Sequence, residues 1–155
     1  MKKILAGFIM DGYGGGIDKY LLNFLEKVHT ENIRIDFLTN EVSPELETFL
    51  QKYHSRIFAI PNLKHPVGQY REVCRILEAE SYDIVYLNIS TAIDCIAAWA
   101  AKKKKVPRIF IHSHTSGNDC ENPVKRMIFD SIHKFCRLSL YRAATVSYTH
   151  LTLPT

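Results

Sequence analysis

The stretch ILAGFIMDGYGGGIDKY, residues 4–20, decides the fold of this chain. An apolar run of strand length is followed by the glycines Gly12, Gly14, Gly15 and Gly16, and then by apolar residues at helical spacing. Glycines let backbone amides crowd into a tight turn, and amides at a helix start favour negative charge. The stretch predicts a strand, a glycine loop that serves a ligand, and a helix. A tight connection without a ligand is the alternative interpretation.

The composition is typical of one globular domain. The chain has 155 residues, of which 46% are hydrophobic and 23% charged. No apolar run approaches the roughly 20 residues of a membrane span. The start resembles a signal peptide, but Asp11 interrupts the apolar run and no small-x-small cleavage pattern follows. We therefore expect a cytoplasmic protein whose net charge of +4 permits anionic partners without requiring nucleic acid.

The cysteines and one lysine run favour ordinary structural roles. Cys74, Cys95, Cys120 and Cys136 are widely spaced, which excludes the spacing of a metal cage and predicts reduced, partly buried thiols. The run Lys102–Lys105 fits a solvated helix end, where cations are favourable. A patch for phosphate or membrane is the alternative for these lysines.

Strand and helix patterns alternate along the rest of the chain. Helical spacing predicts helices over 18–29, 44–52, 69–80, 91–103 and 123–142, and strand patterns cover 34–38, 56–60, 83–87 and 108–112. The segment 62–67 has little periodicity and is expected to be a loop. The nearly apolar run DIVYL, residues 83–87, suits a central parallel strand. Five alternations predict an α/β fold with a doubly wound parallel sheet and right-handed crossovers.

Three polar features follow strands of this predicted sheet. They are the glycine loop 12–16, the segment Asn88–Ser90, and the segment His112–His114. Because parallel strands end at the same edge, we expect these features to share a crevice. Glycine amides, an amide side chain, hydroxyls and imidazoles suit a phosphate-bearing or hydroxyl-rich ligand. We favour a site role for His114, which leaves its strand into a loop, whereas a packing role is equally open for His112.

Other kinds of site fit the sequence less well. A dinucleotide fingerprint would need glycine where Ile17 stands, and the acid expected after the second strand is replaced by Leu38-Thr39-Asn40. No G-K-[ST] follows the glycines, which excludes a P-loop. His112, His114 and Asp119 could begin a metal site, but no second ligand cluster completes it. We expect neither a metal ion nor a cofactor.

The ordered set of motifs resembles the N-terminal half of a family 4 glycosyltransferase of the kind that builds bacterial capsular or exopolysaccharides. The resemblance covers about residues 1–145 and rests on MKKIL (1–5), GGGID (14–18), IRIDFLTN (33–40), YDIVYLNIS (82–90) and RIFIHSHTS (108–116). Asp18 stands where the family usually has glutamate. Tyr86 and Asn88 stand where it commonly has the histidines of V-H-x-H, so no histidine role transfers to that strand.

The resemblance implies a GT-B architecture, in which two Rossmann-like domains face each other across a cleft. This chain would be the first domain, which mainly serves the acceptor, with contacts in loops 39–45, 61–68 and 113–122. The family transfers a sugar from a nucleotide sugar with retention of configuration, usually without a bound metal. By resemblance, Gly14, Gly15 and Gly16 approach the donor phosphates or the transferred sugar, and His114 lies near the reacting sugar as a catalytic residue. Asn88 and Ser90 are further substrate-binding candidates.

The resemblance also implies partners and a missing part. The expected partners are a nucleotide-sugar donor, which would bind a second domain absent here, and a glycan or lipid-linked acceptor, with peripheral contact at the inner face of the membrane. We expect a domain over 1–145 that is inactive alone, and a non-native tail over 146–155, because Val146–Leu151 matches one translation frame of a transposase mosaic end. An ordinary short strand is the alternative for the tail. A standalone module that binds a nucleotide or sugar phosphate without catalysis is the alternative function.

Overall fold

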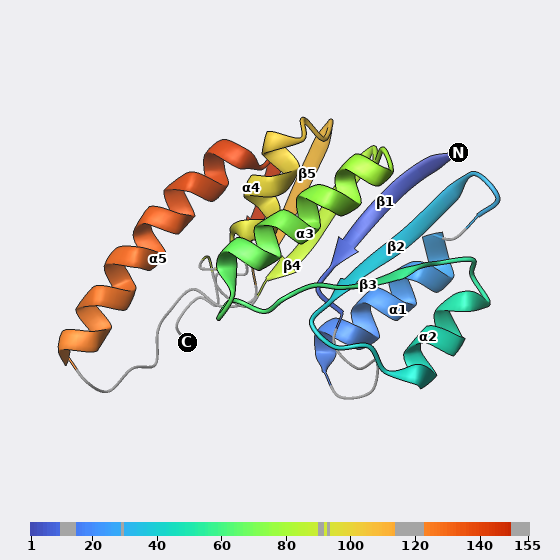
Figure 1. Cartoon of the computed structure of the whole chain (residues 1–155), viewed down its shortest axis with the longest axis horizontal. Coiled ribbons are helices and arrows are strands. Elements are labelled where there is room, and N and C mark those ends of the chain that lie inside the picture. Colours follow the sequence, from blue (N-terminus) through green and yellow to red (C-terminus); the bar gives the residue numbers. More distant parts are fainter. Residues whose placement is uncertain (10–14, 29, 90–91, 93, 114–122, 150–155) are drawn as a thin grey trace.

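A parallel sheet of six strands forms the centre of the described part of the chain (Figure 1). The computed structural model describes residues 1–9, 15–28, 30–89, 92, 94–113 and 123–149. The strands are β1 (Lys2–Gly7), β2 (Ile33–Thr39), β3 (Ile57–Ala59), β4 (Ile84–Ile89), β5 (Arg108–Ser113) and β6 (Val146–Thr149). The helices are α1 (Gly16–Val28), α2 (Pro44–Gln51), α3 (Pro66–Ala79), α4 (Ile96–Lys103) and α5 (Pro123–Ala143).

The strand order is β3-β2-β1-β4-β5-β6, and every neighbouring pair is parallel. This arrangement confirms the predicted doubly wound α/β sheet. It also explains the apolar run at residues 83–87, because β4 lies between β1 and β5 in the interior of the sheet. A strand covered on both faces needs apolar side chains on both.

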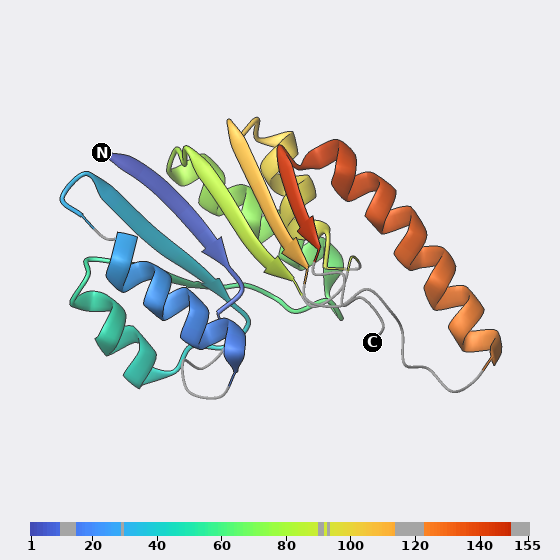
Figure 2. The ribbon, with the colours of Figure 1, turned by 180° about the vertical axis from the view of Figure 1, so that it is seen from behind.

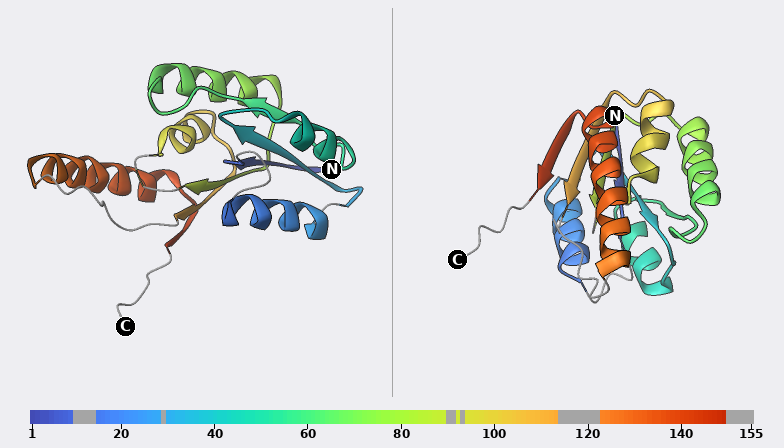
Figure 3. Two further views of the ribbon diagram at one scale, coloured as in Figure 1. Left: turned by 90° about the horizontal axis from the view of Figure 1, so that it is seen from below. Right: turned by 90° about the vertical axis from the view of Figure 1, so that its left-hand side faces the viewer.

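Helices cover the two faces of the sheet. The left view of Figure 3 shows α1 on one face and both α3 and α4 on the other. Side chains alternate along each strand, so Ile4 and Ala6 pack with α1 and α2, whereas Leu5 packs with the opposite layer. Two apolar clusters thus enclose the sheet and hold its strand ends in place.

Some element boundaries differ from the sequence prediction. β1 ends at Gly7, where a Cβ would lie 3.3 Å from both Leu38 Cβ and Leu87 Cδ2, so a larger residue would push these neighbours aside. Phe8 leaves the strand. α3 begins at Pro66 inside the predicted loop 62–67, because proline suits the first turn of a helix. α4 begins only at Ile96, five residues later than the predicted start at residue 91.

A sixth strand lies within the expected tail. β6 pairs with β5 in parallel register, Phe110 opposite Val146 and Ser113 opposite Thr149. Thr145, which precedes β6, is also hydrogen-bonded to β5. Its N–H donates to Ile109 O (2.8 Å), and its Oγ1 accepts from Ile109 N–H (3.0 Å). Residues 146–149 thus adopt the strand conformation that the alternative interpretation expects. The domain boundary and the origin of residues 146–155 stay predictions, since a strand conformation is independent of where the codons came from.

The described cysteines are free thiols with little exposure, and one lysine of the run 102–105 is paired with an acidic residue. Cys95 and Cys136 are buried and Cys74 is half-buried, and all three are free thiols, whereas Cys120 lies outside the described residues. Burial raises the pKa of the Cys95 thiol, and its hydrogen bond with Cys136 raises it further, so the thiol stays protonated at neutral pH. In the lysine run, Lys104 forms an ion pair with Glu78 beside the end of α4.

Candidate functional site

A cavity lies where the first four strands meet the segments that follow them. We call it the edge cavity, and its volume is about 400 Å³. It is lined by Phe8, Ile17, Asn40, Asn62, Leu63, Lys64, Gln69, Asn88 and Asp94. These residues come from the segments after β1, β2 and β3, from the first turns of α1 and α3, from β4 and from the segment before α4. The cavity therefore occupies the carboxyl edge of the sheet, where open α/β folds bind ligands.

Four carboxamide side chains converge on the edge cavity, each from a different segment. Gln69 and Asn88 are buried, with 3% and 2% of their surface exposed. Asn40 donates through Nδ2 to Ile60 O (3.1 Å), and Asn62 accepts through Oδ1 from the Lys64 N–H (3.0 Å), so both amides have defined orientations. A carboxamide both donates and accepts hydrogen bonds, which matches the needs of adjacent hydroxyl groups on a ligand.

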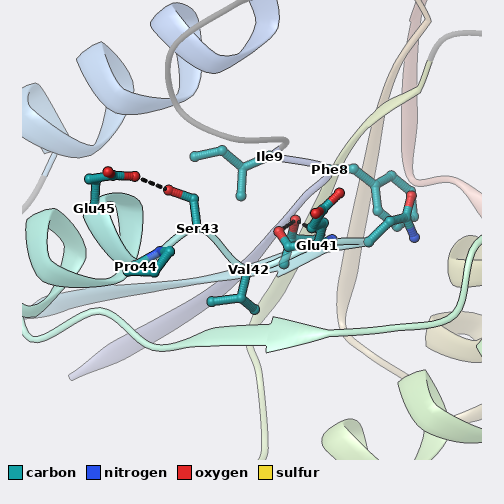
Figure 4. Close-up of a pocket in the computed structure, with 9 residues that line it drawn as sticks. Phe8, Ile9, Glu41, Val42, Ser43, Pro44 and Glu45 are labelled. Atoms are coloured by element: carbon teal, nitrogen blue, oxygen red, sulfur yellow. Dashed lines mark hydrogen bonds between the residues drawn. The ribbon is translucent and has the colours of Figure 1, made fainter.

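A second cavity adjoins the first. The Glu41 cavity has a volume of about 470 Å³ and is lined by residues 39–45 together with Phe8 and Ile9 (Figure 4). Phe8 and Asn40 line both cavities, so the two share a wall. Ser43 donates to Glu45 Oε2 (2.9 Å) at the start of α2, and Thr39 Oγ1 donates to Glu41 O (2.6 Å). The Glu41 cavity adds two carboxylates to the same edge of the sheet.

Aromatic residues lie beside Asn88 on the α1 face. The hydroxyls of Tyr20 and Tyr86 are 3.0 Å apart, and the Tyr86 ring lies 5.8 Å from that of Phe24. Burial raises the pKa of the Tyr86 phenol, and its hydrogen bond with Tyr20 raises it further, whereas the hydrogen bond with Asn88 lowers it. Tyr86 is therefore a neutral phenol at physiological pH. His112 meets Tyr20 edge-on at 6.2 Å between ring centroids, which ties it to this cluster.

The start of α1 lines the edge cavity. Ile17, in the first turn of α1, lines the cavity, and Asp18 is fully buried beside it. A Cβ at Gly16 would meet nothing within 4 Å, and one at Gly15 would meet only Ile17 N at 3.9 Å. Contacts with the described residues therefore do not require glycine at these two positions, and the expected tight turn over 12–16 stays a prediction, because residues 12–14 lie outside that part of the chain.

The structure describes some of the predicted site residues and not others. Asn88 lines the edge cavity, although it lies within β4 and not after it, because β4 extends to Ile89. Gly15 and Gly16 lie at the start of α1, next to the cavity-lining Ile17. The remaining candidates, Gly14, Ser90 and His114, lie outside the described residues. Their roles stay predictions.

The sequence predicted the loops that line the two cavities, but it did not identify Asn40, Asn62 or Gln69 as lining residues. Loops 39–45 and 61–68 were expected to contact a ligand, and they supply much of the lining of both cavities. Asn40 and Asn62 could have been singled out, because each follows a strand of the predicted sheet. Gln69 carried no such signal, since it lies on a helix and is buried only by the packing of α3.

Neither a metal cluster nor a membrane-spanning helix is seen in the described part of the chain. No group of three His, Cys, Asp or Glu side chains gathers among those residues. The metal alternative rested on His112, His114 and Asp119, and the last two lie outside that part. None of the described helices has the length and hydropathy needed to cross a bilayer.

A family model described as Glycosyltransferase Family 4 matches residues 14–149. The chain belongs to this family. The match confirms the family that the sequence motifs indicated. No curated protein sequence matches the chain.

Several solved structures have the same fold as this chain. MurG from Acinetobacter baumannii is 15% identical, with a TM-score of 0.63, over 100% of this chain and 43% of that one. A putative UDP-N-acetylglucosamine 2-epimerase from Listeria monocytogenes is 13% identical, with a TM-score of 0.56, over 96% and 39%. HepE of Anabaena, solved with UDP and glucose, is 13% identical, with a TM-score of 0.52, over 96% and 44%. The family 4 chain thus has their Rossmann-like fold and spans about two fifths of their length.

Proposed function

We propose that this family 4 chain is the acceptor-side domain of a retaining glycosyltransferase that moves a sugar from a nucleotide-sugar donor to a glycan or lipid-linked acceptor. The observation that carries the proposal is the convergence of Asn40, Asn62, Gln69 and Asn88 on the edge cavity. Such a set of amides can satisfy several neighbouring hydroxyls at once, as a sugar acceptor requires.

The start of α1 is the proposed place for the donor phosphates. Gly15 and Gly16 leave open space there, and the first amides of a helix favour an anion. The glycines would then be needed for close approach of the ligand and not for packing of the chain. The UDP and glucose in the related HepE structure support a ligand of this class.

In the proposed reaction, the bond between the anomeric carbon and the diphosphate oxygen breaks and a bond from an acceptor oxygen forms. The acceptor hydroxyl loses its proton, and the nucleotide diphosphate leaves with the bonding electron pair. Backbone amides stabilise the developing charge of the leaving group, and binding in a cleft aligns the two substrates. We assign His114 to the reacting sugar as a catalytic residue, and Gly14 and Ser90 to substrate binding.

The proposed activity belongs to a longer protein. Because the chain spans about two fifths of the related structures, we expect the nucleotide to be held mainly by a second domain and the chain to be inactive alone. We place the whole enzyme in the cytoplasm and assign it to the synthesis of polysaccharides.

A binding experiment with the 155-residue chain tests the proposal. NMR titrations with UDP-glucose, UDP-N-acetylglucosamine and a panel of oligosaccharides would compare the wild type with N62A/K64A in the edge cavity. The matched control, N23A/K27A, replaces the same residue types at exposed positions of α1. We expect oligosaccharide binding that N62A/K64A weakens by about fivefold or more, equivalent to about 1 kcal/mol, and that the control leaves unchanged.

Two other results would point elsewhere. Tight binding of the nucleotide sugars by the chain alone, without oligosaccharide binding, would favour the standalone module. Oligosaccharide binding that N62A/K64A and N23A/K27A affect equally would remove the edge cavity from the proposal.

A further inference from the structure

Gln69 interrupts the apolar pattern on the buried side of α3. The buried residues of this helix are Gln69, Val73, Ile76 and Leu77, and their spacing of four, three and one residues places them on one side. The last three pack in an apolar core cluster. Gln69 continues the same row with only 3% of its surface exposed. Packing of α3 on the sheet therefore gives no reason for a carboxamide at this position.

The carboxamide of Gln69 has no partner within the described part of the chain. Its backbone N–H donates to His65 O (2.9 Å), but its side chain forms no hydrogen bond with the described residues. The arrowheads of β1, β4 and β5 lie at one end of the sheet (Figure 2), and Gln69 lines the edge cavity there together with Asn88 of β4. Because a buried polar group without a partner is unfavourable, the position points to a ligand in this cavity.

Backbone hydrogen bonds link the position of Gln69 to that of Asn62. The N–H of His65 donates to Asn62 O (2.9 Å), and the N–H of Gln69 donates to His65 O. The Asn62 carboxamide is oriented in turn by the N–H of Lys64 (3.0 Å). Two carboxamides of one short segment therefore reach the edge cavity from fixed positions, which lowers the entropy lost when a ligand binds.

The chemistry of a carboxamide indicates which ligand group Gln69 recognises. Its Oε1 accepts a hydrogen bond and its Nε2 donates one, so a partner that satisfies both atoms must donate and accept. A sugar hydroxyl does both, whereas a carboxylate or a phosphate only accepts, and a deoxy position does neither. A site with such a buried group rejects a ligand that lacks the matching hydroxyl, because the group then stays without a partner.

We infer that Gln69 is a specificity-determining residue that recognises one hydroxyl of an acceptor sugar in the edge cavity. The inference rests on the proposed function and adds to it the residue that selects the sugar. Asn40 and Asn62 line the same cavity but are exposed, so water replaces a lost ligand contact there at little cost. Gln69 is far less exposed, and discrimination should therefore be largest at the hydroxyl that it contacts.

NMR titration of the 155-residue chain with sugars tests the inference. The ligands would be the methyl glycosides of glucose, galactose, mannose and N-acetylglucosamine, followed by single-position deoxy derivatives of the one that binds most tightly. Gln69→Met keeps the length of the side chain and removes both of its polar atoms. Gln51→Met makes the same substitution at an exposed position at the end of α2 and is the matched control.

We expect the wild type to bind the deoxy derivative that lacks the recognised hydroxyl about tenfold more weakly than the parent sugar. Gln69→Met should reduce that difference to less than about twofold and leave the losses at the other positions unchanged. Its thermal unfolding midpoint should not fall below that of the wild type, because the substitution removes no hydrogen bond with the described residues. Gln51→Met should retain the affinity and the discrimination of the wild type.

Three outcomes would overturn the inference. Discrimination that Gln69→Met leaves at the wild-type level, for sugars that N62A/K64A binds more weakly, would exclude Gln69 from recognition and keep the edge cavity as the acceptor site. A lower unfolding midpoint for Gln69→Met, with equal weakening of the parent sugar and every derivative, would assign Gln69 a structural role. Absence of binding of all these sugars by the wild type would remove the acceptor site from the proposed function, and the inference with it.

Discussion

Asp36 is a buried acidic residue, and its charge requires several partners. Its carboxylate is fully buried in β2, where it accepts hydrogen bonds from Tyr82 Oη (2.7 Å), Arg56 N–H (2.9 Å) and Arg56 Nη2 (3.0 Å). Arg34 Nη2 lies 3.1 Å away, and Glu80 pairs with both arginines. A buried carboxylate is tolerated only when it is paired and hydrogen-bonded in this way.

Replacing Asp36 should therefore destabilise the folded protein strongly. We expect Asp36→Ala to lower the free energy of unfolding by about 3–5 kcal/mol, because it leaves the arginines and the Tyr82 hydroxyl without their shared acceptor. Tyr82→Phe keeps the ring and should cost only about 1–2 kcal/mol. Urea unfolding of both variants measures the difference. Equal losses in the two variants would show that the carboxylate is not the centre of this network.

Two tyrosines, the buried Tyr82 and the half-buried Tyr86, predict a loss of stability at alkaline pH. Burial raises the pKa of Tyr82, and the hydrogen bond to Asp36 raises it further, while burial and Tyr20 raise that of Tyr86. In the unfolded chain both pKa values are near 10, so the folded state holds its protons more tightly. The free energy of unfolding should be steady up to about pH 9 and fall above about pH 10. Y82F/Y86F should flatten that fall in unfolding experiments across this range, and an unchanged slope would contradict the assignment.

At the scale of elements, a side-chain hydrogen bond joins α4 to α5 beside their apolar contacts. Trp99 Nε1 donates to Ser139 Oγ at 2.6 Å, and both residues are half-buried. This bond lies in the half of α5 that packs on the domain. Losing it would leave the indole N–H without its acceptor, in a region that water reaches poorly.

We expect Ser139→Ala to cost about 1 kcal/mol and to speed amide hydrogen exchange in residues 136–143. Ser131→Ala on the same helix is the control, because Ser131 Oγ donates only within α5, to Met127 O (2.9 Å). That control should leave stability within about 0.5 kcal/mol of the wild type. Equal exchange rates in the two variants would show that α5 is held by its apolar contacts alone.

At the scale of the whole molecule, the proposed transferase function requires more chain than the 155 residues contain. Sequencing the source gene beyond the codon for Thr145 would show whether the reading frame continues into a second α/β domain. A protein completed in this way should transfer sugar from a nucleotide sugar, and the present chain alone should not.

His114→Ala in that completed protein should lower kcat by about 100-fold or more, as for a side chain at the reacting centre. His54→Asn is a suitable control, because His54 is exposed and has a φ of 53°, which asparagine tolerates. Its turnover should equal that of the wild type. A completed protein whose turnover His114→Ala leaves intact would exclude the proposed role of His114, and one without transfer activity would favour the binding module.

Much of the fold could be predicted because local patterns carry it. The apolar run at residues 4–9 and the helical spacing after the glycines identified β1 and α1, and the apolar run DIVYL identified β4 as an interior strand. The ends of elements were less predictable. β1 stops at Gly7, which packs closely against Leu38 and Leu87, and these residues are distant in the sequence. Asp36 gave no signal in the sequence, since Arg56 and Tyr82, two of its partners, come from other segments.

By itself, the sequence determined the alternation of strands and helices, the parallel sheet, the edge at which polar residues gather, and the family. Those properties follow from periodicity and motif order along the chain. Only the tertiary structure decided that Asn40, Asn62, Gln69 and Asn88 line one cavity, and that Asp36 meets Arg56 and Tyr82. Both depend on the strand order β3-β2-β1-β4-β5-β6 and on which helix covers which face. Contacts between distant segments set that order, and no local pattern of side chains encodes it.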